Sequence, residues 1–351
     1  MISIKTESFK EKMPLYKAVI SNQNPYHESF YMDFGNLEIY FSNGVIFGRD
    51  KFLIHQEDGD TLPENIFING FEFLFLCSKF DSIEYYGNGC FKSKDGGEYK
   101  LKSFSEDFVR PNFEKNDEVK QSITCWDSFK RNLKDSIPFI DPNFGSMFNG
   151  IYIQGNNIRS LTSKILYNAT IEDNLDLIFR SDSIKILDFF IGYDNFDIYT
   201  SGQESMKLVK DDLILLFAND SSLSFRKDLG DTLLEKADLS TFIEVEKKKL
   251  VEALSFFEFF VEKEKILLTL VDGNLLIDYT TEASNIKRLC SVRETNLKEI
   301  TFAVSVFQMK KAINTIIDDT ILLKVKDGIS TISISGKNNS EKQIVMALFS
   351  I

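Results

Sequence analysis

An amphipathic helix pattern recurs six times along the chain at nearly even spacing. Each predicted helix follows a short strand rich in β-branched or aromatic residues and precedes a meander of alternating strands. The helix starts lie near residues 7, 69, 126, 181, 245 and 305, so they are 62, 57, 55, 64 and 60 residues apart. Every second interval, from 7 to 126 and from 126 to 245, is 119 residues. The repeat predicts three domains of two half-units each, at 1–118, 119–237 and 238–351.

The last unit shows the pattern most fully. Residues 301–304 favour a strand, and Ser305 can cap the free amides of a helix that begins near Val306. The apolar stripe of this helix consists of Val306, Met309, Ile313 and Ile316. A hairpin through Asp327–Gly328 and an apolar tail, 343–351, follow. One such unit cannot bury both of its faces, so two units should pair their helices beneath two sheets in an α+β fold.

The other helices are predicted at 7–20, 69–80, 126–137, 181–190 and 246–260. Pro14 should kink or shorten the first of them, because proline removes a helical hydrogen bond. Gly155–Asn156 predicts a hairpin turn between strands at 148–154 and 157–161. A charged connector at 114–120 is expected to separate the first two domains, and the third unit is expected to start after the segment 229–237.

Composition indicates a globular protein with several cores, because 43% of its 351 residues are apolar. The opening 1–5 lacks the basic and apolar regions of a secretion signal, and no window approaches the roughly 18 apolar residues of a membrane span. We therefore expect a cytoplasmic protein, in a bacterium or in the host of a phage.

The sequence offers little support for catalysis or metal binding. His27 and His55 are the only histidines, and neither has a recognisable catalytic setting. The cysteines form no C-x-x-C pair and are expected to be buried free thiols: Cys77, Cys90, Cys125 and Cys290. The glycine-rich stretches 87–89 and 95–97 lack the lysine and spacing of a phosphate loop. We expect no enzymatic activity, no catalytic residues, no cofactor and no metal site.

Charge is distributed unevenly between the predicted helices and the rest of the chain. The six helices carry thirteen Lys and Arg against ten Asp and Glu, so a chain of net charge −12 carries −15 elsewhere. A weakly basic surface within an acidic protein suits the holding of a polyanion without tight contacts. Surface lysines on any single helix are, however, ordinary solvent-exposed residues. The segment 181–190, at −1, also contradicts a uniformly basic lining.

A strand, a one-sided helix with exposed cations, and a meander ending in an apolar tail resemble the last module of a DNA sliding clamp. The resemblance is to the bacterial β-type processivity factor and covers nearly the whole chain. Residues 104–113 are similar to the segment that ends the family's first domain, and 149–153 to the opening of its second. The resemblance implies the DNA clamp fold, closed as a head-to-tail homodimer into a pseudo-sixfold ring. Such a ring encircles duplex DNA and tethers a replicative DNA polymerase.

The resemblance also implies that the helices line the bore of the ring. Their exposed cations should then face phosphates without reading base edges, so that DNA binding is independent of sequence and sensitive to salt. The expected DNA-facing residues are Lys10, Lys17, Lys130, Arg131, Lys134, Lys247, Lys248, Lys310 and Lys311. Lys92 and Lys94, placed in a peripheral meander, serve as controls.

In the family, the polymerase, the clamp loader and other clients insert a short linear peptide between domains two and three. By resemblance, the positions that line this groove here are Thr162, Leu166, Tyr167, Val345, Met346, Leu348, Phe349 and Ile351. An apolar C-terminus is either a buried edge strand or the lining of a binding site, and the two are compatible. The family's Thr-Asp-Gly-His-Arg-Leu loop is replaced here by the segment 162–167. The groove is therefore expected to prefer a different peptide.

Two other classes of function stay open at this point. One is a clamp-fold accessory protein that binds a replication partner without encircling DNA. The other is a β-rich structural or ligand-binding protein of a virus or a host-associated bacterium. Retention on circular but not linear DNA would distinguish the first of these from a sliding clamp.

Overall fold

The computed structural model describes residues 2–21, 26–56, 61–104, 108–114, 117–141, 143, 148–192, 195–201, 205–218, 227–259, 265–280, 285–328 and 330–350. The chain divides into two compact units. Unit 1 comprises Met1–Ser122 and Asp182–Ser221, and unit 2 comprises Ile123–Ser181 and Ser222–Ile351. The division into three domains stays a prediction.

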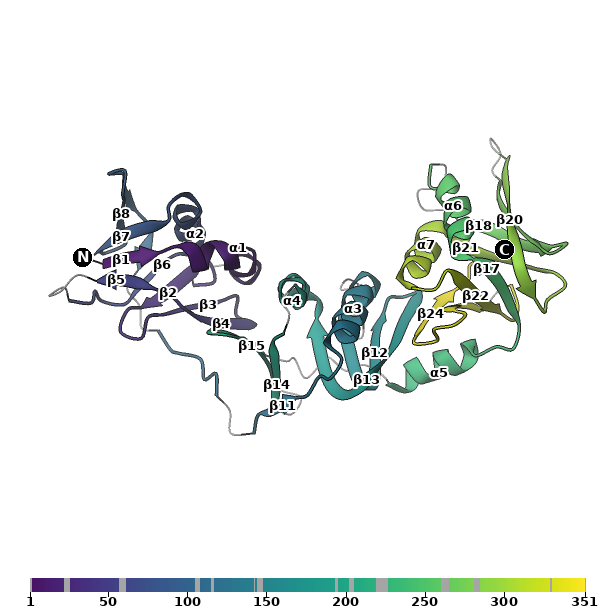
Figure 1. Ribbon diagram of the computed structural model, residues 1–351, viewed down its shortest axis with the longest axis horizontal. Helices are drawn as coiled ribbons and strands as arrows, with labels where there is room; N and C mark the ends of the chain where they lie inside the picture. The colour runs from purple at the N-terminus through teal and green to yellow at the C-terminus, as the bar shows by residue number, and fades with distance from the viewer. Residues whose placement is uncertain are drawn as a thin grey trace. The chain divides into compact units, whose positions relative to one another are not determined.

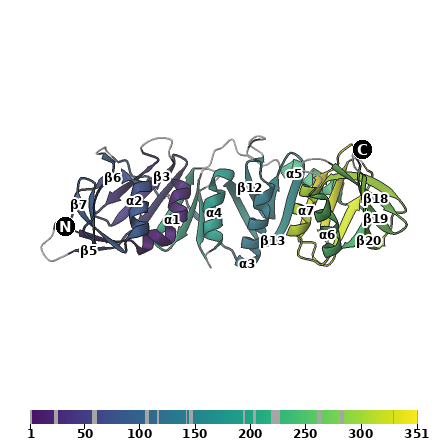
Figure 2. The same ribbon diagram turned by 90° about the horizontal axis from the view of Figure 1, so that it is seen from above.

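Unit 1 contains two antiparallel sheets in its described residues, with helices on one side (Figure 1). One sheet has the order β5–β1–β7–β8–β9, with β1 Ile2–Lys5, β5 Ile54–Gln56, β7 Ser82–Gly87, β8 Cys90–Ser93 and β9 Glu98–Lys100. The other has the order β10–β6–β2–β3–β4–β16–β15–β14–β11, with β2 Ser29–Asp33, β3 Glu38–Ser42, β4 Ile46–Lys51, β6 Ile66–Asn69, β10 Ser103–Phe104, β11 Val119–Gln121, β14 Asp197–Ser201, β15 Ser205–Lys210 and β16 Leu213–Ala218. The helices are α1 Glu7–Val19, α2 Gly70–Lys79 and α4 Ile184–Ile191, which also lie together in Figure 2.

Aromatic side chains form the core between these helices and the sheets. The Phe9 and Phe73 rings of α1 and α2 meet edge to face, with centroids 5.0 Å apart. Tyr16 meets Phe41 of β3 in the same geometry at 5.0 Å. The Tyr16 hydroxyl also donates a hydrogen bond of 2.5 Å to the fully buried carboxylate of Asp50. Two helices thus share one core beneath two sheets, as the paired half-units predict.

Unit 2 contains a sheet of ten strands in its described residues, in the order β12–β13–β24–β23–β22–β17–β20–β19–β18–β21. The strands are β12 Gly150–Leu161, β13 Ile165–Arg180, β17 Phe242–Glu246, β18 Lys265–Val271, β19 Asn274–Thr280, β20 Asn285–Thr295, β21 Ile300–Ser305, β22 Thr320–Val325, β23 Thr331–Gly336 and β24 Lys342–Ala347. The helices are α3 Trp126–Ser136, α5 Lys227–Ala237, α6 Lys247–Phe257 and α7 Val306–Thr315, with 3-10 turns η1 Ile137–Phe139 and η3 Ser181–Ser183. In Figure 1, α5 lies on the opposite side of the strands from α3 and α7.

The predicted helical repeat is confirmed. The six expected helices correspond to α1, α2, α3, α4, α6 and α7, each between a strand and a meander. The Ser305 side chain caps α7 by accepting a hydrogen bond of 3.4 Å from the amide of Gln308. Continuous sheets cross both predicted domain boundaries, since β4 pairs with β16 and β13 pairs with β24.

Two local predictions were wrong, and a third was wrong in part. Pro14 was expected to kink or shorten α1, but the helix is not shortened and continues past the proline to Val19. The predicted hairpin at Gly155 is a bulge within the single strand β12, where Gly155 has a φ of +63° that glycine adopts readily. The segment before the third domain, for which no element was predicted, forms helix α5. Cys90 and Cys125 are partly exposed, whereas Cys77 and Cys290 are buried free thiols as expected.

Candidate DNA-facing and peptide-binding surfaces

The predicted cations of α1 differ in how far they are available to a ligand. Lys10 Nζ lies 2.7 Å from a carboxylate oxygen of Asp81, and its side chain is 34% exposed. The hydrogen bond and charge of Lys10 lower the pKa of Asp81. Lys17, on the same helix, is exposed and has no ion-pair partner among the described residues. Lys17 is therefore the freer cation of this helix.

The cations of α7 and α6 are more constrained than the sequence predicted. Lys310 is paired with Glu258 at 2.6 Å. Lys311 is half-buried, donates a hydrogen bond to the carbonyl of Pro138, and lies 5.1 Å from the centroid of the Phe139 ring. Burial lowers the pKa of Lys311. The expectation that both lysines project freely into solvent is wrong, because each is held by residues of unit 2.

The remaining predicted cations lie on α3 and at the start of α6. Lys247 is partly buried and donates a hydrogen bond to the carbonyl of Ile316. Lys130 is partly buried, and Arg131 is exposed at 4.0 Å from Glu341. Lys134 and Lys248 are exposed, with no ion-pair partner in the described part of the chain. We refer to Lys17, Lys134 and Lys248 as the open lysines.

The predicted peptide-binding residues divide between two faces of the unit 2 sheet. Leu166 of β13 pairs with Val345 of β24, and both belong to a buried cluster on the side covered by α5. The other buried members of this cluster are Tyr152, Leu161 and Ala237. We call the surface formed by this cluster and α5 the α5 face.

Tyr167 and Met346 point the other way, because successive residues of a strand face opposite sides of the sheet. The buried Tyr167 hydroxyl donates a hydrogen bond of 3.2 Å to the carbonyl of Asn132 in α3. Its ring stacks on Phe139 with centroids 5.4 Å apart. Burial raises the pKa of Tyr167 well above 10. Leu166 and Tyr167 therefore lie on opposite faces of the sheet. The expectation that both line one peptide-binding groove is wrong for this pair.

The accessible members of the predicted set lie at a turn and in the C-terminal segment. Thr162, Leu348 and Phe349 are partly exposed, and Ile351 lies outside the described residues. The Phe349 amide donates a hydrogen bond of 3.0 Å to the carbonyl of Ala303. Lys164 Nζ lies 4.2 Å from the centroid of the Phe349 ring. The C-terminal segment is thus an ordered edge as well as a candidate lining.

Helix α5 adds side chains to the α5 face that the sequence analysis missed. Leu229, Leu233 and Leu234 pack against the cluster of Leu166 and Val345. An ion pair anchors the helix, because Asp231 lies 2.7 Å from the buried guanidinium of Arg159. The helical signal was present, since Leu229 and Leu233 are four residues apart on a segment that lacks proline.

Among the described residues, no group of three or more His, Cys, Asp and Glu side chains is arranged to hold a metal ion. None of the helices in the described part of the chain is long and apolar enough to span a membrane.

Comparisons of sequence find no relative. A scan against protein-family models gives no match, and a search of curated proteins also gives none. Solved structures, in contrast, match along the whole chain. DNA polymerase III subunit beta from Pseudomonas aeruginosa matches with a TM-score of 0.82 at 13% identity, covering 100% of both chains. The chain has the β-clamp fold.

Two further clamps match equally fully. The DNA polymerase III beta subunit of Thermotoga maritima gives a TM-score of 0.81 at 11% identity, with 100% of each chain covered. The Helicobacter pylori beta clamp, solved with a DNA ligase peptide bound, gives a TM-score of 0.80 at 14% identity, again with 100% of each chain covered. At such identities the match establishes the fold, and the function has to be argued from surfaces.

Proposed function

We propose that this chain is a DNA sliding clamp that encircles duplex DNA and tethers a replicative DNA polymerase. The observation that carries the proposal is the match of the β-clamp fold over 100% of this chain and 100% of the solved clamps. Every half-unit of a clamp is therefore present. We propose further that the protein has no catalytic activity of its own and acts in the cytoplasm.

The open lysines support a DNA-facing role for the helices. In unit 1, Lys17 lies on a helix at one side of the sheets, and in unit 2 the same holds for Lys134 and Lys248. Lysines without ion-pair partners can approach phosphates without first breaking an internal contact. They are few in a chain of net charge −12, so binding should be weak enough to allow sliding.

Closure of the ring requires two chains, arranged head to tail with domain one against domain three. Outermost strands of the sheets in the described residues, such as β9, present unpaired backbone groups at one edge. Pairing of such strands between subunits would satisfy these backbone amides and carbonyls and produce a closed, symmetric assembly. We therefore propose a homodimer.

The α5 face is the proposed docking surface for partner peptides, including those of the polymerase and the clamp loader. It combines the Leu166 and Val345 cluster with the leucines of α5, next to the partly exposed Leu348 and Phe349. A cluster of apolar side chains beside a partly exposed edge suits the anchoring of a short linear peptide. Tyr167 and Met346 act here through the core rather than by direct contact.

The test of the ring uses nicked circular plasmid DNA. Protein mixed with the plasmid is separated by gel filtration, and half of the complex is then cut once with a restriction enzyme. A clamp stays with the circle and is released from the linear molecule. Equal retention on both forms, or a monomer at tens of micromolar by light scattering, would exclude the ring.

Removal of Leu348–Ile351 tests the proposed docking surface. The truncated chain should lose binding to the cognate polymerase while it stays folded, because Leu348 and Phe349 directly follow the strand that carries Val345 of the α5 face and are partly exposed. Unchanged affinity for the polymerase, with an unchanged circular dichroism spectrum, would show that partners dock elsewhere.

A second candidate is a clamp-fold accessory protein that does not encircle DNA. It is favoured by one observation: Lys10, Lys310 and Lys311 are engaged within the chain, which leaves less positive charge for DNA. The plasmid experiment separates the two candidates, because an accessory protein binds its partner without retention on the circle.

A further inference from the structure

The face of the unit 1 sheet that points away from the helices is lined with aromatic rings. The connector 108–114 lies against it, and Phe108 stacks on Tyr31 with centroids 4.2 Å apart. Phe108 also contacts Tyr40 and Phe67, at 5.1 and 5.6 Å. The chain itself therefore shows what this face accommodates, which is a peptide segment that inserts a phenylalanine between rings.

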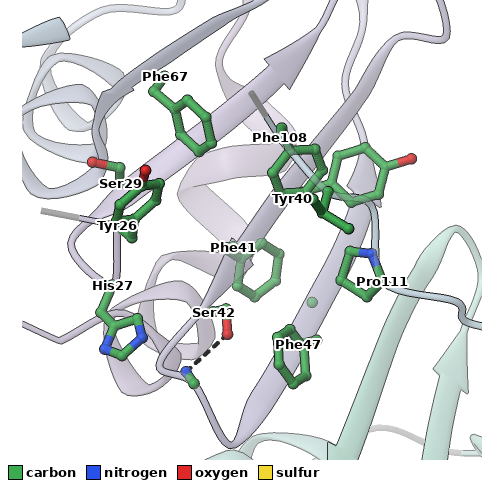
Figure 3. Close-up of a pocket in the computed structure, with 13 residues that line it drawn as sticks. Tyr26, His27, Ser29, Tyr40, Phe41, Ser42, Phe47, Phe67, Phe108 and Pro111 are labelled. Carbon is green, nitrogen blue, oxygen red and sulfur yellow. Dashed lines mark hydrogen bonds between the residues drawn. The ribbon is translucent and has the colours of Figure 1, made fainter. Parts of the chain in front are cut away.

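A cavity of about 310 Å³ lies beside this connector and is not filled by it. Figure 3 shows Phe67, Phe108, Tyr40 and Phe47 around the cavity, with His27 and Ser42 at another part of its wall. The lining includes Tyr26 and Val109, which are 47% and 86% exposed. The cavity thus opens to solvent past two apolar side chains.

The lining restricts the chemistry of a ligand. The described lining residues include no Lys, Arg, Asp or Glu, and His27 is the one side chain among them that can carry a charge, so they offer little to neutralise a phosphate, a carboxylate or an ammonium group. Its volume is at the lower end of the roughly 300–1,000 Å³ that ligand pockets span. A single uncharged aromatic side chain fits these limits, whereas the several charges of a nucleotide's phosphates would meet at most one cation, His27, among the described lining residues.

The internal repeat identifies what kind of molecule would bring that side chain. Phe47 and Leu166 are 119 residues apart, the period of the predicted domains. Phe47 on β4 faces Leu216 on β16, as Leu166 on β13 faces Val345 on β24. At the same period of 119 residues, 108–114 of the connector correspond to 227–233 of α5, which covers the second pair. The cavity is thus the first-repeat counterpart of the α5 face.

We propose that this cavity is a second docking site, which takes a short linear peptide of a partner protein by one Phe, Tyr or Trp side chain. The proposal rests on the proposed function, because it assigns to the first repeat the peptide docking assigned to the α5 face. A neighbouring apolar residue of the peptide packs on Tyr26 and Val109. The two sites differ in chemistry: leucines wall the α5 face, and aromatic rings wall the cavity.

The main chain next to the cavity can assist. Within the described residues, Phe108, Val109 and Arg110 take part in no backbone–backbone hydrogen bond. A peptide laid alongside them can pair with these amides and carbonyls, as in recognition by strand addition. Arg110 stays in place through its ion pair with the buried Asp33, so the wall is held while the peptide binds.

The experiment begins with a phage-displayed library of random heptapeptides, selected on the immobilised full chain. Selected peptides are synthesised with a fluorescent label, and their Kd values are measured by anisotropy. Val109→Asp places a charge at the exposed mouth, and Ser42→Trp fills the interior from the hairpin of β3 and β4. Val119→Asp, at a 60% exposed position outside the cavity, is the matched control.

We expect peptides that contain an aromatic residue and that bind about tenfold or more weakly to both cavity variants. Their affinity for Val119→Asp and for the chain lacking Leu348–Ile351 should be unchanged. The proposal is overturned if no peptide is selected, if the peptides lack aromatic residues, or if the truncation rather than the cavity variants removes binding. It is also overturned if Val109→Asp lowers the mass of the free protein in light scattering, because the occupant is then a second copy of the chain. Peptide binding needs no closed ring, so failure of the plasmid experiment would be a separate result.

Discussion

Replacement of the three open lysines by glutamate should weaken DNA binding without unfolding the protein. The variant combines Lys17→Glu, Lys134→Glu and Lys248→Glu, all at exposed positions on helices. Because these side chains have no ion-pair partner among the described residues, the free energy of unfolding should change by no more than about 0.5 kcal/mol per site. Lys310 and Lys311 are poorer targets, because their replacement would also break internal contacts.

The size of the effect follows from counterion release. Each cation that neutralises one phosphate adds roughly 0.9 to the slope of log affinity against log salt, so three add about 2.7 per chain. Between about 0.05 and 0.2 M salt, the natural protein should then lose about 40-fold more affinity than the variant. Water-mediated contacts would lower this factor, since fewer ions are released.

The assay is fluorescence anisotropy with a labelled duplex of about 30 base pairs, measured over a series of salt concentrations. Lys92→Glu, Lys94→Glu and Lys298→Glu form the matched control, because they change the net charge equally at positions in meanders and loops. A slope that falls equally in both triple variants would mean that only the net charge matters. The helices would then not be the DNA-facing surface.

Two further predictions concern the contacts that hold the docking faces. Asp231→Ala leaves the Arg159 guanidinium buried without its carboxylate and should cost about 2 kcal/mol in urea unfolding. Asp238→Ala, which removes a far more exposed ion pair, should cost less than about 0.5 kcal/mol. Although burial opposes ionisation, turn hydrogen bonds and the charge of Arg110 lower the pKa of Asp33 below 3.8. The stability that this carboxylate contributes is therefore present above pH 3.8 and is lost as the pH falls through the lower pKa that Asp33 has in the folded protein. Asp33→Asn should remove this part of the acid dependence when the free energy of unfolding is measured as a function of pH.

The helices could be predicted from the sequence because their signals are local. The stripe from Val306 to Ile316 has helical spacing, and Ser305 is both the predicted and the observed cap. Turn signals were less decisive. Gly155 has a positive φ, but it forms a bulge and not the predicted hairpin turn, because both flanking segments pair with β13. Whether a glycine turns a chain or bulges a strand depends on the partner strand.

The candidate sites were less predictable because they depend on contacts distant in sequence. Helical periodicity alone predicts that Lys310 is exposed. Its ion-pair partner Glu258, however, lies 52 residues earlier in the chain, next to α6, and contacts it from there. Lys311 is in the same position with respect to Pro138 and Phe139. No pattern on α7 itself records these partners. The predicted peptide-binding residues are a different case. A strand that contains both Leu166 and Tyr167 already implies that these two side chains face opposite sides of the sheet.

Two strand pairs of this chain share their geometry but not their side chains, which illustrates how a β-clamp fold coexists with 11–14% identity to solved clamps. A strand pair with a covering segment occurs twice, at β4 with β16 and at β13 with β24, and the paired residues Phe47 of β4 and Leu166 of β13 are 119 residues apart. One connector is an irregular segment that presents phenylalanines, and the other is a helix that presents leucines. Because packing requires only apolar side chains of suitable volume at these positions, each face is free to differ in shape. Two faces of different shape select different peptides, so a repeated fold can carry docking sites of different specificity.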